Sequence, residues 1–371
     1  MNQPLDPDRI QAALDAVHRA GIPAAFAEIR DGDDVFSGAS GIADLDTGAP
    51  ATADMRHRVG SITKTFTAVA VLRQVEQGHI GLDTPIGHYL PHLVPGDRGD
   101  AITVRMLIGH TSGLPDYLPH AYPSLAAFPR IADTTPRSLE DHRFTRFDPV
   151  DLITLGVKAP ATRAPGDRPG VYSNTNYLLL SQLLEKVTGA VAEQHITDDV
   201  IAPAGLRDTE LATTTHIDGP HPRIYESWFG MFDPPRDFSV FDMSWVGASA
   251  SAISTVADLN RFFGLLLDGR ILRPATLEHM RRTGPVILFE GTTLDYGLGL
   301  TRKDVPGRGA FWGHDGSVWG GGAISMTSAD GGRQVSLAVT RQRWNPLDAN
   351  GKPQPHPIDK ALADLYALAM S

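Results

Sequence analysis

The sequence predicts an α+β fold, in which an antiparallel sheet flanked by helices is built from both ends of the chain and carries an inserted, mainly helical lobe. Three observations support this prediction. Strand-like segments lie near both ends of the chain, helical pieces and proline-rich loops fill the middle, and short turns typical of hairpins join neighbouring strands. With 371 residues, the chain is long enough for two lobes. We expect one lobe from residues 1–78 and 250–371 and the other from residues 79–249.

The first part of the chain predicts a helix, a hairpin and a second helix. Residues 10–20 have apolar side chains at helical spacing. Residues 24–30 and 35–42 are typical of strands, and the four residues between them, Asp-Gly-Asp-Asp, favour a hairpin turn. Residues 61–77 again show helical spacing, and Gly78 marks the end of that helix.

The remaining elements follow the same division between a helical middle and a strand-rich end. Shorter helices are expected at residues 103–108 and 177–188, between proline-rich loops at residues 114–136 and 163–170. A helix at residues 254–267 precedes strands at residues 294–300, 309–313, 323–328 and 334–340, with a hairpin turn at residues 329–332 and a closing helix at residues 357–370.

Composition excludes several classes of function. The formal net charge is −10 and there is no basic stripe, so we expect no nucleic-acid partner. The chain has no cysteine, which excludes disulfides, thiolate metal sites and cysteine nucleophiles. The sequence shows no export signal and no apolar run long enough to span a membrane. As the sequence stands we expect a cytoplasmic protein, or an extracytoplasmic one if an export signal has been trimmed.

The first chemical motif is Ser61 with Lys64, at the start of the helix at residues 61–77. Residues three apart on a helix share a face, so the Lys64 amine can reach the Ser61 hydroxyl. A serine hydroxyl becomes a good nucleophile when a neighbouring base takes its proton. Lys64 can be that base if burial or a cationic neighbour lowers its pKa. A surface serine and lysine on an ordinary helix is the alternative.

Two further motifs lie later in the chain. Tyr172 and Asn174 precede a helix; a tyrosine with a lowered pKa can pass a proton, and an asparagine amide can hold a substrate carbonyl. The alternative is a helix cap. His314 and Gly316, with Ser317 after them, follow a predicted strand, where backbone N–H groups can face an oxyanion. A histidine in a hairpin loop is the alternative there.

Taken together, the three motifs resemble those of the serine β-lactamases and DD-peptidases, and in particular their class C-like branch. The Ser-x-x-Lys, Tyr-x-Asn and His-x-Gly motifs occur in the same order and at plausible separations. The resemblance extends along nearly the whole chain and includes residues 57–61, 103–114, 172–189, 251–263 and 296–300.

The resemblance implies a role for each motif residue. Ser61 would attack a carbonyl, Lys64 and Tyr172 would exchange its proton with the leaving group, and His314 would support Tyr172 electrostatically. Asn174 would hold the acyl-side amide. The backbone N–H groups of Ser61 and Ser317, beside Gly316, would form the oxyanion hole, in a site between the two lobes. The resemblance implies no metal and no organic cofactor.

Two positions depart from the carboxypeptidases of this branch. Thr301 stands where they place an arginine for the substrate's free carboxylate, and Arg302 would face the other way on a regular strand. Asp315 stands in place of a threonine and would repel a carboxylate. Both changes argue against a free C-terminal carboxylate as the favoured ligand.

These observations favour a serine hydrolase that forms an acyl-enzyme on ester or amide substrates resembling D-amino-acid peptides. An acyltransferase or a peptide-releasing cyclase is the alternative, and a non-catalytic sensor or binding module is a third. The expected partner is a small-molecule or peptide acyl substrate. Aromatic residues that can line its pocket, or simply pack, are Tyr117, Trp228, Trp245 and Trp319.

Overall fold

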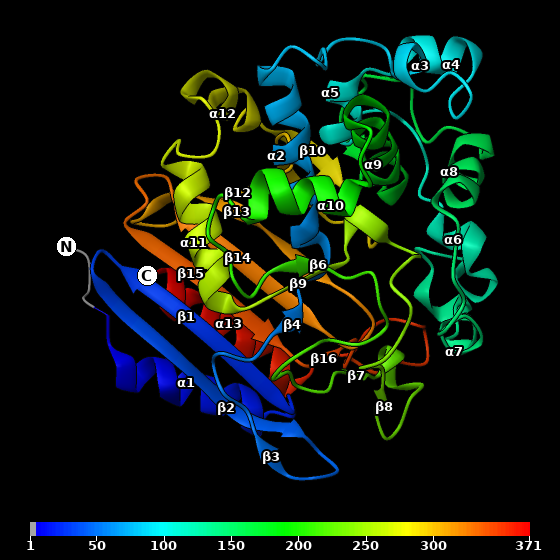
Figure 1. Cartoon of the computed structure of the whole chain (residues 1–371). Helices are drawn as coiled ribbons and strands as arrows, with labels where there is room; N and C mark the ends of the chain where they lie inside the picture. Colours follow the sequence, from blue (N-terminus) through cyan, green and yellow to red (C-terminus); the bar gives the residue numbers. More distant parts are fainter. Residues whose placement is uncertain (1–4) are drawn as a thin grey trace.

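The computed structural model describes residues 5–371 and contains one large sheet with helices on both faces (Figure 1). Across the sheet the strand order is β3-β2-β1-β15-β14-β13-β12-β11-β10-β5. All neighbours pair antiparallel except β5 and β10, which pair parallel. The strands are β1 (Ala24–Asp31), β2 (Asp34–Asp44), β3 (Ala49–Pro50), β5 (Gly170–Val171), β10 (Gly284–Ile287), β11 (Thr293–Tyr296), β12 (Thr301–Val305), β13 (Gly309–Ser317), β14 (Gly322–Ser328) and β15 (Arg333–Val339). The prediction of an antiparallel sheet built from both ends of the chain is confirmed, because β1 pairs with β15.

The two faces of the sheet carry separate cores. On one face, α1 (Pro7–Arg19) and α13 (Pro357–Met370) pack against each other and against the sheet. On the other face lies α11 (Val256–Leu267), which contacts β1, β14 and β15. Alternation along β1 divides its side chains between the cores, so that Ala27 joins the core under α1 and α13 while Phe26 joins the core under α11.

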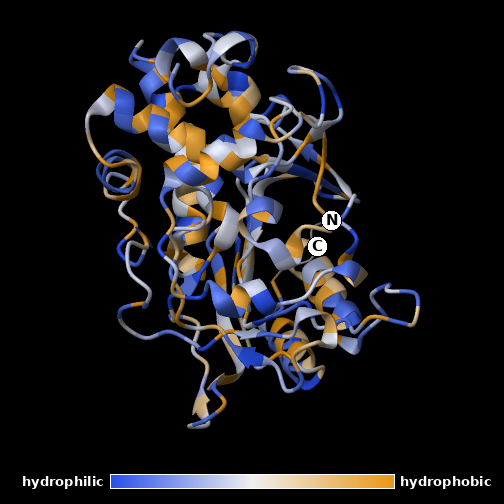
Figure 2. Ribbon diagram, turned by 90° about the vertical axis from the view of Figure 1, so that its right-hand side faces the viewer, coloured by the Kyte–Doolittle hydropathy of each residue, from blue (hydrophilic) through white to orange (hydrophobic). Residues whose placement is uncertain are grey.

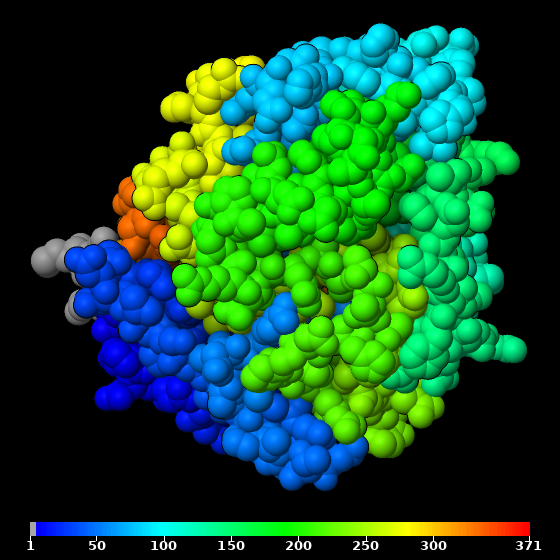
Figure 3. Space-filling view, viewed as in Figure 1, coloured from blue at the N-terminus to red at the C-terminus, as the bar shows by residue number. Residues whose placement is uncertain are grey.

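The middle of the chain is mainly helical and packs around two long helices, α2 (Thr63–Glu76) and α9 (Asn174–Thr188). Both helices are buried over most of their length, including every residue of α2 from Thr63 to Leu72. Figure 2 shows many hydrophobic residues (orange) among the helices in the upper part of the view. In Figure 3 the middle of the chain (green) fills the centre of the view and meets N-terminal residues (blue) below it. The other helices are α3 (Ile86–Tyr89), α4 (Gly96–Ala101), α5 (Val104–Ile108), α6 (Leu118–Ala121), α7 (Arg137–Asp141), α8 (Pro149–Lys158), α10 (Ala192–Ile196) and α12 (Pro274–Met280).

Two small sheets connect the parts of the chain. One has the order β4-β9-β6 and the other β16-β7-β8. Their strands are β4 (His57–Arg58), β6 (Glu210–Leu211), β7 (Tyr225–Glu226), β8 (Arg236–Asp237), β9 (Ala252–Ser254) and β16 (Arg341–Gln342). Pairing of β4 with β9 holds the segment just before Ser61 against the segment that precedes α11.

Most predicted elements are confirmed. The helices expected at residues 10–20, 61–77, 177–188 and 254–267 are present with ends that differ by at most three residues, once the 3-10 turn η1 (Gly60–Ile62) is counted with α2. The first hairpin is also confirmed, with Asp31 opposite Asp34. The closing helix at residues 357–370 matches α13.

One predicted strand is wrong and another is too short. Residues 294–300 do not form one strand, because β11 ends at Tyr296 and the Gly297 N–H donates to the Leu300 carbonyl over 2.8 Å, which closes a turn into β12. Gly299 in that turn has a φ of +79°, a conformation that favours glycine. The strand expected at residues 309–313 continues to Ser317, so that the His-Asp-Gly motif lies within β13 and not in a loop.

The division into two lobes stays a prediction. The middle segment contributes β5 to the edge of the large sheet, and residues 1–4 of the predicted first lobe lie outside the described residues. Within residues 5–371, no helix combines the length and the apolar character needed to cross a membrane.

Candidate active site

Ser61 and Lys64 lie side by side at the beginning of α2. Ser61 is in the 3-10 turn η1, and Lys64 is in the first turn of α2 that continues from it. The Lys64 amine donates to the Ser61 hydroxyl over 3.0 Å. Ser61 is partly exposed whereas Lys64 is fully buried, so the nucleophile faces the outside and its partner lies beneath it.

The Lys64 amine is surrounded by neutral acceptors. It donates to the side-chain oxygen of Asn174 over 2.7 Å and to the backbone carbonyl of Ser249 over 3.0 Å. Burial lowers the pKa of Lys64 from 10.5 to about 7, while Asp116 and Asp315 act in the opposite direction. A substantial fraction of Lys64 is therefore neutral near pH 7 and able to accept a proton.

Asn174 owes its position to Asp116, which the sequence analysis did not identify. The buried Asp116 carboxylate accepts the backbone N–H of Asn174 and that of Leu118, and thereby caps the start of α9. Ser173, a cap candidate from the sequence, uses its hydroxyl on the Pro115 carbonyl instead. The capped helix directs the Asn174 side chain to Lys64.

Tyr172 lies against the same pair of residues. Its ring centroid is 4.9 Å from the Lys64 nitrogen, and its side chain is close enough to Ser61 for the two to interact. The idea of a tyrosine with a lowered pKa is wrong for this arrangement: burial raises the pKa of Tyr172 well above 10, and the interaction with Ser61 offsets only part of that effect. Tyr172 is therefore a protonated phenol beside a lysine that can be neutral.

His314 is buried but its ring contacts a different tyrosine. Its Nε2 lies 3.1 Å from the Tyr296 hydroxyl, and Tyr296 in turn lies edge-on to the Tyr172 ring. Burial lowers the pKa of His314 to about 3, so the ring is neutral at pH 7. The electrostatic support of Tyr172 by His314 stays a prediction, in which His314 would act as a neutral ring.

Two glycines bring β13 against the nucleophile. A Cβ on Gly316 would lie 2.4 Å from the Ser61 nitrogen and 2.2 Å from the Val59 oxygen. A Cβ on Gly60, which has a φ of +56°, would lie 2.5 Å from the Ser317 nitrogen. The backbone nitrogens of Ser61 and Ser317 thus belong to two segments in close contact, as the oxyanion-hole prediction requires.

Asp315 and Trp245 differ in how they face a substrate. The Asp315 side chain is 61% exposed and directly precedes Gly316 in the chain. Trp245 is only 6% exposed and stacks on Trp319 with ring centroids 4.7 Å apart, so it serves mainly to pack the wall beside Ser317.

Thr301 and Arg302 directly follow the Tyr-Gly-x-Gly-Leu run of residues 296–300, and the structure shows what each side chain contacts. The Thr301 side chain is buried, and its hydroxyl donates to the Gly313 carbonyl. Arg302 pairs with the exposed Asp304 over 2.8 Å. Neither residue presents a free cation beside Ser61.

Sequence reasoning missed the residues that lie behind the motif residues. Three of these residues contact motif residues: Ser249 contacts Lys64, Asp116 contacts Asn174, and Tyr296 contacts His314. The fourth is Tyr177, whose ring centroid lies 5.5 Å from the Lys64 amine. Tyr296 stands within the 296–300 run and Asp116 two residues after the 103–114 run, so the extent of the resemblance was the available signal. Ser249 acts through its backbone, which no sequence pattern marks.

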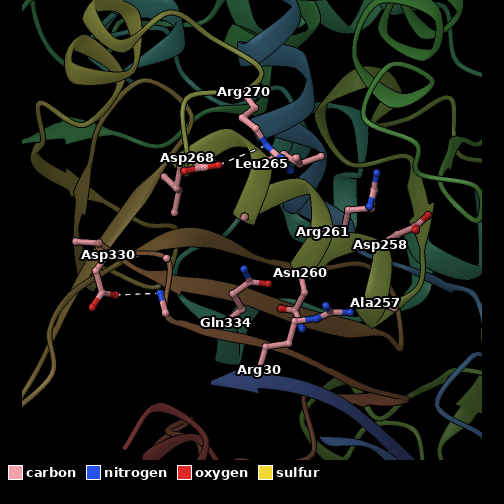
Figure 4. Close-up of a pocket in the computed structure, with 15 residues that line it drawn as sticks. Arg30, Ala257, Asp258, Asn260, Arg261, Leu265, Asp268, Arg270, Asp330 and Gln334 are labelled. Carbon is pink, nitrogen blue, oxygen red and sulfur yellow. Dashed lines mark hydrogen bonds and ion pairs between the residues drawn. The ribbon is translucent and has the colours of Figure 1, made fainter. Parts of the chain in front are cut away.

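A cavity of about 710 Å³ lies away from this site, between α11 and the turn that joins β14 to β15. Figure 4 shows that Asp258 and Arg261 on its rim project away from Gln334, while Asp268 and Arg270 pair with each other. Within residues 5–371, no three histidine or carboxylate side chains gather closely enough to hold a metal ion.

The structure combines a sheet covered on both faces with a serine and a buried lysine that lie against a strand containing a glycine. This combination defines the class of the serine β-lactamases and DD-peptidases. The model of the Beta-lactamase family matches residues 8–356, and the chain belongs to that family. The resemblance inferred from the motifs is thereby confirmed.

Two relatives show how the chain compares with known proteins. It is 26% identical over 306 residues to Penicillin-binding protein 4* of Bacillus subtilis, covering 80% of this chain and 62% of that protein. It is 27% identical over 337 residues to a D-aminopeptidase of Cereibacter sphaeroides, covering 90% of this chain and 60% of that protein. The chain therefore spans about three fifths of these two relatives.

Among solved structures, a D-stereospecific amidohydrolase from a Streptomyces species superposes with a TM-score of 0.80. The two are 32% identical, and the match covers 91% of this chain and 95% of that one. The likeness thus extends over nearly the full length of both proteins.

We predict that Gly316→Ala lowers kcat by about 100-fold or more, the scale of a lost oxyanion-hole donor. The added Cβ would overlap the Ser61 nitrogen and push β13 away. Gly332→Ala is the matched control, because its nearest neighbour would be 3.4 Å from the new Cβ. Steady-state kinetics on an ester substrate tests this, and near-normal kcat in Gly316→Ala would contradict the geometry.

We also predict that kcat/KM rises about tenfold per pH unit below pH 7 and levels off above it, because only neutral Lys64 can take the Ser61 proton. Lys64→Ala should remove turnover, and Lys186→Ala, at an exposed position on α9, should keep the profile. A pH-independent kcat/KM between pH 5 and 8, the range set by a pKa of about 7, would rule Lys64 out as the base.

Proposed function

We propose that the protein is a serine hydrolase that forms an acyl-enzyme on Ser61 and acts on amides and esters of D-amino acids or short peptides that contain them. The observation that carries this proposal is the fully buried Lys64 amine, 3.0 Å from the Ser61 hydroxyl and with a pKa of about 7. This pair supplies what a serine nucleophile requires, namely an adjacent base that is unprotonated near neutral pH.

In acylation, neutral Lys64 takes the Ser61 proton while the hydroxyl oxygen attacks the substrate carbonyl. The oxyanion that forms is stabilised by the backbone N–H groups of Ser61 and Ser317. Tyr172 is protonated and close to Ser61, so it can donate its proton to the leaving group as the carbonyl–heteroatom bond breaks. Protonated Lys64 then restores the Tyr172 proton.

In deacylation the same groups act in reverse. A water molecule gives a proton to neutral Lys64 and attacks the ester carbonyl, and the Ser61 oxygen leaves as its proton is returned. No step needs a charged His314, in agreement with its low pKa. At the end of one turnover, Ser61, Lys64 and Tyr172 have returned to their starting protonation states.

The substrate class is proposed from two sources. The Streptomyces relative is named as a D-stereospecific amidohydrolase and the Cereibacter relative as a D-aminopeptidase. The exposed Asp315 carboxylate beside Gly316, with the Thr301 hydroxyl occupied by Gly313, disfavours a free carboxylate on the leaving group. Both sources support amides and esters as acyl donors.

The first test uses a fluorophosphonate and matched D- and L-amino-acid p-nitroanilides. We expect the reagent to add once, on Ser61, and the D-substrate to be hydrolysed faster than the L-substrate. Ser61→Ala should lose labelling and should retain less than about a thousandth of the turnover. Labelling of another serine, or a preference for the L-substrate, would contradict the proposal.

The second test concerns the leaving group. We expect an acyl-D-alanyl-D-alanine amide to have at least a tenfold higher kcat/KM than the same peptide with a free carboxylate, since a lost charge-assisted contact costs roughly 1.5–3 kcal/mol. Asp315→Asn keeps the side-chain shape, removes the charge and should narrow the ratio. Asp304→Asn, on the exposed face of β12, is the control. A wild-type preference for the free acid would restore the plain carboxypeptidase alternative.

A further inference from the structure

His110 is a buried histidine that the proposed chemistry leaves without a task. Its φ of +56° is rare for a residue with a Cβ, and such a conformation persists only where the surrounding structure determines it. Its ring is fully buried. Surrounding contacts must therefore hold it in this conformation, and their nature shows what the residue does.

Contacts from His110 hold the backbone on both sides of Tyr172. Its carbonyl accepts the Val171 N–H over 3.0 Å, and its ring Nδ1 accepts the Ser173 N–H over 3.2 Å. The approach is close, because a Cβ on Gly170 would lie 2.3 Å from the His110 oxygen. The main chain before and after Tyr172 is thus fixed to one residue.

The ring of His110 also supports the ring of Tyr172 directly. The two rings stack with centroids 4.1 Å apart and an interplanar angle of 29°. The same imidazole makes a T-shaped contact with the Tyr296 ring, with the ring centroids 4.8 Å apart. The Tyr172 ring is therefore stacked on His110 and makes a T-shaped contact with Tyr296.

This support requires a neutral imidazole with its proton on Nε2. Nδ1 receives the Ser173 N–H and lies 3.1 Å from the Asn176 amide nitrogen, so it must carry a lone pair. Burial, together with Lys64 and His314, lowers the pKa of His110 well below 6.5. The acceptor is therefore present across the range in which Lys64 titrates.

We propose that His110 is a positioning residue, which sets the place of the Tyr172 hydroxyl relative to Ser61 and Lys64 through its backbone contacts and its ring. The proposal rests on the proposed function only in that Tyr172 carries a proton during turnover. His110 touches neither the nucleophile nor a substrate, and acts through Tyr172.

The test begins with two single variants. His110→Asn suits a positive φ and keeps an acceptor but removes the stacked ring; His110→Phe keeps a ring and removes the acceptor. Each should lower kcat by about 10- to 100-fold while KM stays within about threefold, because Tyr172 acts in the transition state and not in substrate binding. Unchanged kcat in both would overturn the proposal.

A double-mutant cycle separates positioning from a general structural effect. If His110 acts through Tyr172, then His110→Asn should have little further effect in a Tyr172→Phe background. Equal effects of His110→Asn in the two backgrounds would show that it acts elsewhere and would overturn the proposal. If His110→Asn does not fold, as judged by circular dichroism, His110→Phe supports the same cycle.

His18→Asn is the matched control, since His18 lies on α1, on the far face of the sheet, and bonds only locally to the Ile22 carbonyl. It should leave kcat unchanged. Fluorophosphonate labelling of Ser61 is measured beside turnover. A wild type that neither labels nor turns over substrate contradicts the proposed function, whereas an active wild type with additive His110 effects contradicts only the positioning role.

Discussion

The burial of the Lys64 amine among neutral oxygens is the interaction on which the rest of the site depends. A pKa that falls from 10.5 to about 7 corresponds to roughly 5 kcal/mol in favour of the neutral amine. Three segments far apart in the sequence supply its partners, Ser61 from η1, Asn174 from α9 and Ser249 from the loop before β9. The sheet and the helices must therefore both be assembled before Lys64 becomes a base.

Three aromatic residues near Lys64, namely Tyr172, His110 and His314, do not compete with it for protons near neutral pH. Burial keeps Tyr172 protonated and keeps His110 and His314 neutral. Lys64 is therefore the member of this group whose charge changes in the physiological range. A site built in this way needs a fixed arrangement of donors and acceptors more than it needs charge, which is why contacts that orient Tyr172 matter.

The sequence predicted the elements that periodicity and turn residues determine, such as α13 and the hairpin between β1 and β2. It predicted the motif residues because three spacings agreed with one family. It failed where backbone geometry decides. The turn after Tyr296 depends on glycines that can also occur in strands, and the continuation of β13 to Ser317 depends on pairing with β14. The contacts of Asp116 and His110 arise from loops whose path no local pattern specifies.

Asp116 and Asp315 show how the same side chain takes different roles in one site. The Asp116 carboxylate accepts two backbone N–H groups and is buried, so its capacity is used within the protein. Asp315 is 61% exposed beside the oxyanion-hole strand, and its charge is available to whatever binds there. Both carboxylates raise the pKa of Lys64 against the effect of burial. A bound cationic or neutral leaving group would leave this balance intact or move it toward the neutral amine, whereas a second anion beside Asp315 would favour protonated Lys64 and leave less of the neutral amine. The charge of the substrate and the fraction of neutral Lys64 are thereby coupled through Asp315, the residue that stands in place of a threonine.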